Sequence, residues 1–398
     1  MKKKGIIAIV IIILLGVIIT TMFISKNNQK FIMQDGMMLA MTLTDEDGTR
    51  NITEFPERGA YNIEIDCGDT AKGIWLVEEW KLGVEDIKGN VKCNINFYSE
   101  SYYLTQALID DVFDCLEMGG FDGPTSLEEM CDDKYTDGLR YTGKNPSNWV
   151  WFNGEKWRII GVIPTKTTSG TENLVKIIRS ESIGAYAYDA SSTSSSSLQG
   201  AWGSNTLYSL LNTYYYASDA TKMNGQSHAG CYGYYNSSSQ PKPNCDYSEI
   251  GILSSSYYGK MVKNVYWNTG ASAINATPSA AYANEIGTQT VSGYIGLMTA
   301  SDWGYAASSS FHSIAMNSYT SSSNKATETS WIFNNGGEWT SIQNSSRTNY
   351  ALEVNHSGYL STTGARYGFA VRPVVYLDSS VYIISGDGTE GNPYQIGM

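Results

Sequence analysis

Apolar and polar residues alternate in short runs along much of the chain, and a period of two predicts β-strands that bury one face. Residues 61–67 follow this pattern, and residues 91–97 repeat it after a Gly89-Asn90 turn. Another apolar run covers residues 73–77. We therefore expect residues 31–98 to form a small β-sandwich-like domain.

The pattern changes after residue 98. Leu104 begins a series of apolar residues at helical spacing, which Gly119-Gly120 ends. A second helix signal starts at Pro124, with acidic residues in its first turn. Residues 99–138 are therefore expected to form a helical connector.

The largest predicted domain begins at residue 139. An Asn153-Gly154 turn between aromatic and β-branched residues predicts a β-hairpin. A short helix is expected at residues 207–215, and residues 186–290 contain a long stretch rich in Ser, Tyr, Asn and Gly. Further strands are expected at residues 174–179, 294–298, 350–354, 369–377 and 381–384. We expect residues 139–398 to form one α+β domain with long loops.

Twenty uncharged residues extend from Gly5 to Ile24, directly after three lysines. Twenty helical residues span roughly the 30 Å hydrocarbon core of a bilayer, and the lysines favour a cytoplasmic N-terminus. Residues 1–30 are thus predicted to be a cytoplasmic tip and a transmembrane helix, with the bulk of a single-pass chain outside the cell. The alternative is a cleaved signal peptide, although a small-residue cleavage site is lacking.

The charge balance excludes several classes of protein. The chain has 27 Lys and Arg against 39 Asp and Glu, and its formal net charge is −12. Nucleic-acid binding needs a basic patch, so no nucleic-acid partner is expected. With only 3 His, a His-rich metal site is not expected either, and no cofactor is predicted.

Six cysteines fall into three pairs of neighbours along the sequence. Nearest-neighbour pairing would close three loops, whereas six cysteines allow 15 connectivities, and free buried thiols are the alternative. The absence of a CxxC motif argues against a zinc ribbon or a thioredoxin-like site. The candidate disulfides are Cys67 with Cys93, Cys115 with Cys131, and Cys231 with Cys245.

Several sequence blocks carry a family resemblance over about residues 140–398. The blocks are residues 148–161 (NWVWFNGEKWRIIG), 295–306 (IGLMTASDWGYA), 338–340 (EWT) and 371–377 (VRPVVYL). This region resembles an uncharacterised domain of extracytoplasmic proteins in Gram-positive and wall-less bacteria. It is more remotely similar to the C-type lectin-like and formylglycine-generating-enzyme superfamily. The resemblance implies a compact α+β fold with paired terminal strands.

The resemblance does not imply a known activity. The sequence lacks the triplet with which calcium-dependent lectins bind sugars, and no active-site cysteine pair is identified. The acidic run at residues 387–392 is expected to be a hairpin turn rather than a calcium loop. Arg372 is expected to lie in a buried strand, where it needs a carboxylate or carbonyl partner.

The excess of Tyr, Trp, Ser and Asn is the strongest functional signal. Rigid aromatic side chains and adaptable hydrogen-bonding groups are typical of binding surfaces. We therefore expect non-catalytic binding of a glycan, a peptide or another surface ligand through aromatic-rich loops. The ligand-binding candidates are Trp202, Tyr214, Tyr216, Tyr234, Trp267, Asp302 and Trp303.

Two other functions stay open. An extracytoplasmic enzyme acting on wall or glycan substrates would need a pair of carboxylates in a cleft, for which Asp302, Glu338 and Glu353 are nominal candidates. A structural component of the envelope is the third hypothesis. A pair of ionisable groups in one deep pocket would favour the enzyme, and an aromatic surface without such a pair would favour the binding protein.

Overall fold

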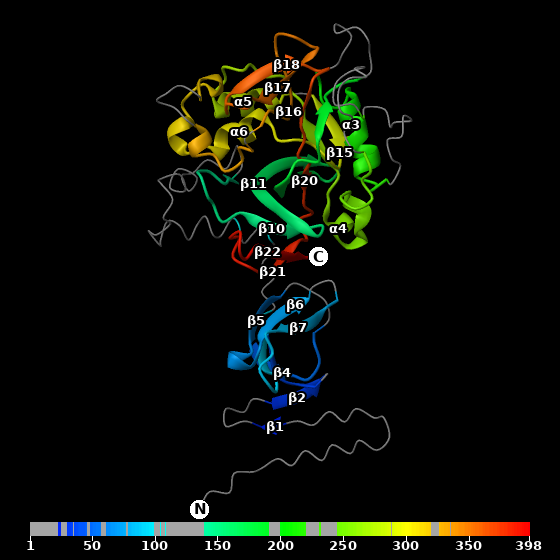
Figure 1. Ribbon diagram of the computed structural model, residues 1–398, viewed down its shortest axis with the longest axis vertical. Coiled ribbons are helices and arrows are strands. Elements are labelled where there is room, and N and C mark those ends of the chain that lie inside the picture. Colours follow the sequence, from blue (N-terminus) through cyan, green and yellow to red (C-terminus); the bar gives the residue numbers. More distant parts are fainter. Residues whose placement is uncertain are drawn as a thin grey trace, which may run out of the picture. The chain divides into compact units, whose positions relative to one another are not determined.

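Strands dominate the structure, a computed structural model that describes residues 23–24, 30–34, 36–45, 48–56, 61–76, 79–98, 104, 108, 139–190, 200–219, 231, 245–287, 289–319, 326–334 and 336–398. They account for 40% of it, and helices for 17%. The chain divides into two compact units (Figure 1). The first comprises Met1–Tyr103, Tyr382–Ser385 and Gln395–Met398; the second comprises Leu104–Val381 and Gly386–Tyr394.

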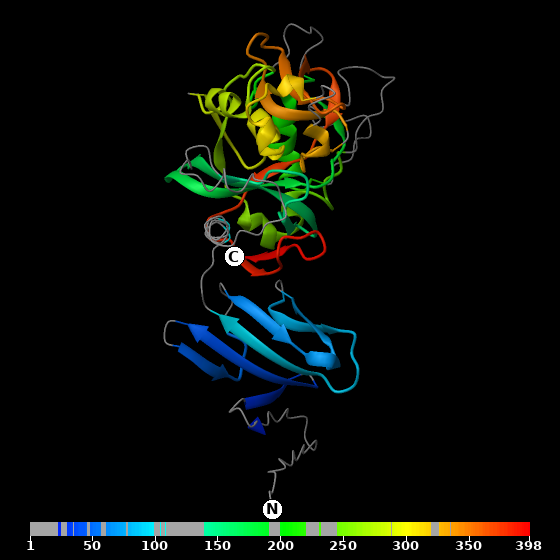
Figure 2. The ribbon, with the colours of Figure 1, turned by 90° about the vertical axis from the view of Figure 1, so that its left-hand side faces the viewer.

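The first unit is built on a mostly antiparallel sheet, visible as blue and cyan strands in Figure 2. Its strands are β1 (Phe23–Ile24), β2 (Lys30–Gln34), β3 (Met37–Asp45), β4 (Gly48–Ile52), β5 (Asn62–Asp66) and β8 (Lys92–Tyr98), ordered β1-β2-β3-β8-β5 with β4 on β3. Strands β3 and β8 run parallel. A separate hairpin joins β6 (Lys72–Leu76) to β7 (Lys81–Glu85).

Strand β8 shows why this region folds as strands. Cys93, Ile95 and Phe97 are buried, and the polar residues between them are more accessible. The Trp75 indole packs edge-on against the Phe97 ring at 5.3 Å. Ile384 of β21 (Tyr382–Ser385) belongs to the same buried cluster, so the last strands of the chain complete this core.

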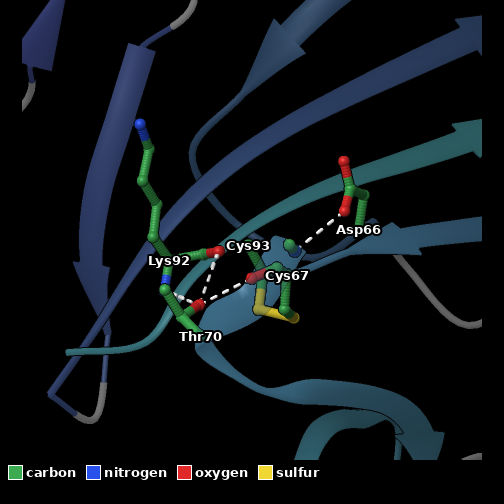
Figure 3. The surroundings of a disulfide bond; sticks show 6 residues. Asp66, Cys67, Thr70, Lys92 and Cys93 are labelled. Atoms are coloured by element: carbon green, nitrogen blue, oxygen red, sulfur yellow. Dashed lines mark hydrogen bonds between the residues drawn. A yellow bond between two sulfur atoms is a disulfide. The ribbon is translucent and has the colours of Figure 1, made fainter. Parts of the chain in front are cut away.

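The Cys67–Cys93 disulfide ties the end of β5 to β8 across 26 residues, as the neighbour pairing predicts (Figure 3). Thr70, in the 3-10 turn η1 (Gly68–Thr70), fixes the surrounding backbone. Its hydroxyl donates to the Cys67 carbonyl at 2.6 Å and accepts from the Lys92 amide at 3.2 Å. The second predicted pair, Cys231–Cys245, is also bonded. Cys115 and Cys131 lie outside the described residues.

The second unit contains a sheet around the long strand β11 (Glu155–Thr167). The Asn153-Gly154 turn, with positive φ at both residues, joins β11 to β10 (Trp149–Phe152) as predicted. Within this unit the sheet also contains β9 (Leu139–Arg140), β12 (Gly170–Arg179), β14 (Val265–Asn268), β15 (Thr290–Gly293) and β20 (Val374–Tyr376). The hairpin of β21 and β22 (Tyr394–Gly397) is closed by a turn in which the Asp387 amide donates to the Asn392 carbonyl at 3.1 Å.

A second sheet in this unit has the order β13-β19-β16-β17-β18. Its strands are β13 (Ala185–Ala187), β16 (Glu338–Gln343), β17 (Tyr350–Val354), β18 (Leu360–Gly364) and β19 (Gly368–Ala370). Short helical elements lie beside the sheets (Figure 1): α3 (Thr206–Leu210), the π-helical turn η4 (Leu211–Tyr215), η5 (Ile252–Ser254), α4 (Ser256–Met261), α5 (Pro278–Glu285), α6 (Ala300–Ala306), η6 (Ser309–Phe311), η7 (Met316–Ser318) and η8 (Ala326–Glu328).

The expected fold class is wrong in its balance of elements. We expect the large domain to be α+β and C-type-lectin-like, but the structure as a whole is mostly strand, at 40%, with 17% helical. Among the described helices the longest, α5, has 8 residues. The described part of the aromatic-rich stretch at residues 186–290 forms short strands and short helical turns. Residues 294–298, expected as a strand, make only an isolated bridge at Gly296.

The predicted membrane anchor, and with it the single-pass cell-membrane localisation, also requires correction. Within the part of the chain that the structure describes, no helix is both long enough and apolar enough to cross a bilayer. Of the segment from Gly5 to Ile24, on which that expectation rests, the structure describes only Phe23 and Ile24, as strand β1. Most of the expected connector at residues 99–138 also lies outside the described residues.

Candidate functional site

An open groove of about 550 Å³ lies in the second unit, between the loop before α5, the turn η7 and the strands β17 and β18. These elements lie at one end of the unit (Figure 1). Amide, hydroxyl and guanidinium side chains predominate in its lining: Ala273, Ile274, Asn275, Asn317, Asn344, Ser346, Arg347, Tyr350 and Thr362.

Backbone hydrogen bonds hold the walls of the groove together. The Ser272 amide donates to the Gln343 carbonyl at 3.1 Å, and the Ser345 amide donates to the Ser272 carbonyl at 3.0 Å. On the other side, the Met316 amide donates to the Ala276 carbonyl at 3.0 Å. Each wall is thus fixed before a ligand arrives, which lowers the entropic cost of binding.

The turn between β16 and β17 presents the main polar groups. The Asn344 carboxamide oxygen accepts from the Ser346 amide at 2.8 Å, an arrangement in which Asn favours a turn. The Tyr350 amide donates to the Arg347 carbonyl at 3.1 Å, and the Asn344 amide donates to the Tyr350 carbonyl at 3.0 Å. A short polar sequence therefore folds back on itself and displays its side chains on the groove.

Arg347 and Tyr350 form the aromatic and cationic part of the groove. The Arg347 guanidinium carbon lies 4.9 Å from the centre of the Tyr350 ring. Tyr350 pairs across the sheet with Gly364. Arg347 is exposed, and no carboxylate in the described part of the chain lies within ion-pair distance of it. Its charge is therefore available to a ligand.

The lining residues set what the groove can do chemically. Amides and hydroxyls both donate and accept hydrogen bonds, and the tyrosine ring supplies a flat apolar face. None of the lining residues is an Asp, Glu, His or Cys. The described residues also contain no group of three or more such side chains that could hold a metal ion. The groove is thus suited to binding a polar molecule and lacks a general acid–base pair.

The three predicted ligand-binding tryptophans lie in the interior. Trp202, Trp267 and Trp303 are 3%, 3% and 0% exposed. The Trp267 indole donates to the Gly293 carbonyl at 2.9 Å, so the backbone satisfies its polar atom. Trp202 packs edge-on against Tyr208. These residues stabilise the core and offer no exposed aromatic face.

The predicted tyrosines are placed differently. Tyr214 and Tyr216 are half-buried around η4, and the Tyr216 ring stacks on Tyr294 with centroids 4.0 Å apart. Neither residue lines the groove. Tyr234 lies outside the described residues.

Asp302 lies in a buried cluster of ionic groups. It is the third residue of α6 and closes a capping box, because its carboxylate accepts from the Thr299 amide at 2.8 Å. Its oxygens lie 2.5 Å from the Lys176 ammonium nitrogen and 3.5 Å from Arg140 Nε. The two cations hold the pKa of Asp302 below its usual value, although burial is the largest single influence and acts in the opposite direction.

Glu285, at the end of α5, lies beside this cluster. Its carboxylate accepts from the Ser301 amide at 2.9 Å and from the Ser301 hydroxyl at 2.5 Å. Burial raises the pKa of Glu285. Because Ser301 precedes Asp302, this contact fixes the first turn of α6.

The other two nominal carboxylates do not come together with Asp302 in a cleft. Glu338 pairs with Arg372, whose guanidinium also donates to the Ile332 carbonyl at 2.6 Å, so the predicted need of Arg372 for a partner is confirmed. Glu353 is buried in β17, and burial raises its pKa to about 7. These groups do not form the open carboxylate pair that glycoside hydrolysis requires.

Sequence reasoning missed the groove residues. The signal that could have found its turn is the polar run from Asn344 to Asn349 between two strand patterns. Asn275 and Asn317 come from distant loops, and no local pattern connects them to that turn.

Comparisons with known proteins found no relative of this chain: no family model, no curated protein and no solved structure matches it.

Proposed function

We propose that the chain is a non-catalytic binding protein whose groove takes a carbohydrate ligand. The observation that carries this proposal is the lining of the groove. It combines a tyrosine ring, three carboxamides, hydroxyls and one guanidinium, without a carboxylate. Sugars present hydroxyls that pair with amides and C–H faces that stack on aromatic rings.

The rigidity of the groove supports the same proposal. Its backbone is held by hydrogen bonds on both sides, and its Tyr350 ring already carries the Arg347 guanidinium. Preorganised polar sites gain affinity because fewer groups must be ordered on binding. The enzyme hypothesis gains no comparable support, since the ionisable candidates are buried in ion pairs or in separate places.

A glycan array probed with the full chain tests the proposal. We expect retention on a defined set of glycans, and we expect Tyr350→Ala to weaken binding at least about tenfold, equal to about 1.4 kcal/mol. The matched control is Tyr367→Ala. Tyr367 is exposed, carries Arg366 over its ring at 5.2 Å, and lies outside the groove.

Two outcomes would contradict the proposal. One is the absence of retention on every glycan by a folded sample. The other is equal loss of binding in the Tyr350→Ala and Tyr367→Ala variants, which would place the ligand away from the groove.

A further inference from the structure

A buried lysine and a buried aspartate lie in contact within the second unit. The Lys176 ammonium nitrogen is 2.5 Å from an Asp302 carboxylate oxygen, and their side chains are 3% and 0% exposed. Reacting atoms that are held about 3–3.5 Å apart gain a large rate advantage from proximity alone. The contact therefore holds the lysine nitrogen against the carboxylate group, away from bulk water.

The register of the sheet holds the lysine in this position. Gly161 of β11 pairs with Lys176 on one side and with Arg140 of β9 on the other. Paired residues on neighbouring strands project on the same face, so both cations point toward the first turn of α6. Asp302 is fixed from its own side by the capping box with Thr299.

Aromatic rings, a second cation and the buried Glu285 carboxylate surround the pair. The Lys176 nitrogen lies 5.7 Å from the Trp267 ring and 5.5 Å from the Tyr376 ring. Arg140 Nε lies 3.5 Å from the other Asp302 oxygen. A guanidinium at this place can stabilise negative charge that develops on a carbonyl oxygen.

We propose that Lys176 and Asp302 become joined by an intramolecular amide bond. The ammonium first gives one proton to the carboxylate, which makes a neutral amine and a carboxylic acid. The amine nitrogen attacks the carboxyl carbon, and a C–N bond forms while one C–O bond breaks. Of the three ammonium hydrogens, one stays on the amide nitrogen and two leave with the oxygen as water. No oxidant or reductant is needed.

Burial and the ionic partners act in opposite directions on the proton transfer that starts this reaction. At rest the two groups form an ion pair, and the partners keep the pKa of Lys176 raised. Burial is nevertheless the largest influence on each group, and it opposes both charges. The proton transfer must therefore work against the partners, which keep the pKa of Lys176 raised and that of Asp302 lowered.

The intact mass of the full chain, after disulfide reduction and denaturation, tests the proposal. We expect the mass to be lower than the sequence mass by one water. After proteolysis, we expect one branched peptide that contains both Lys176 and Asp302, and no tryptic cleavage after Lys176.

Three variants distinguish a Lys176–Asp302 amide bond from a simple ion pair. Lys176→Arg keeps the charge but lacks a reactive amine, so it should keep its full sequence mass. Asp302→Asn should lose ammonia and reach the same final mass as the cross-linked natural chain. Arg140→Lys moves the cation away from the carboxyl oxygen and should slow bond formation, about 100-fold by analogy with the loss of one oxyanion donor.

A folded natural chain at its full sequence mass, with Lys176 recovered in ordinary tryptic peptides, would overturn the proposal. Loss of water that maps to any other pair of residues would overturn it equally.

Discussion

Arg372 and Glu338 form a two-point ion pair inside the second unit. Arg372 Nε and one terminal nitrogen donate to the two Glu338 oxygens at 2.8 and 2.7 Å, and both side chains are 4% exposed. The pair connects the segment before β20 to β16. Such geometry is the strongest form of a charge-assisted hydrogen bond.

We expect Glu338→Ala to lower the free energy of unfolding by about 3–5 kcal/mol, because it leaves the Arg372 charge buried without its carboxylate. Urea unfolding followed by tryptophan fluorescence measures this loss. Adding Arg372→Met to the same chain should recover part of the stability, since the unpaired charge is then gone. No recovery in the double variant would contradict this explanation.

Gly161→Ala is expected to lower the free energy of unfolding by more than about 2 kcal/mol, at the severe end for single substitutions. A Cβ atom built at Gly161 would lie 1.8 Å from the Leu139 carbonyl oxygen, at the irregularity in the β11–β12 ladder. Gly391→Ala is the control, because a Cβ there meets nothing within 4 Å. Equal melting temperatures for the two variants would show that β9 does not lie against Gly161.

The Cys67–Cys93 bond should stabilise the first unit by about 3–4 kcal/mol, the loop-entropy value for a separation of this size. The double variant Cys67→Ala, Cys93→Ala removes it while keeping β5 and β8 apolar at these positions. Hydrogen exchange of the β8 amides reports on this unit specifically. Unchanged exchange in β8, with the bond absent, would mean that the sheet does not depend on the cross-link.

Glu353 gives the chain a pH-dependent term in its stability. Burial raises the pKa of Glu353 from 4.5 to about 7. A carboxyl group whose pKa is higher in the folded state than in the unfolded state stabilises the fold while it is protonated. This stabilisation is complete at a pH below the unfolded-state pKa and is lost as the pH rises through the folded-state pKa, about 7. The difference is at most about 3 kcal/mol.

Comparing Glu353→Gln with the natural chain isolates this term. We expect the natural chain to lose stability relative to the variant between about pH 4.5 and 7, as measured by urea unfolding at several pH values. A stability difference that stays constant over this window would contradict the assignment.

Local sequence signals are sufficient to predict a feature when one short segment determines its structure. The Asn153-Gly154 turn needs positive φ at two adjacent residues, and this dipeptide supplies them. The Cys67–Cys93 pairing joins neighbours in the sequence, and the buried Arg372 had to find an acceptor near its own strand.

The function of the aromatic residues could not be predicted in this way. Composition does not distinguish a tryptophan on the surface from one in the core, because backbone carbonyls can satisfy a buried indole, as Gly293 does for Trp267. The groove depends on loops brought together only by the tertiary fold. Asn275 and Arg347 are 72 residues apart, and the Ser272 contacts with the β16–β17 turn help to bring them together.

The position of Ile384 in the first core has a consequence for synthesis on the ribosome. The sequence of the second unit is inserted within that of the first, so the first core lacks Tyr382 and Ile384 until translation has passed the whole insert. At about 5–20 residues per second this delay is long compared with the folding of most small domains. The inserted unit therefore has time to fold first. A chain that ends early would leave the first unit, although most of it is already synthesised, without strand β21.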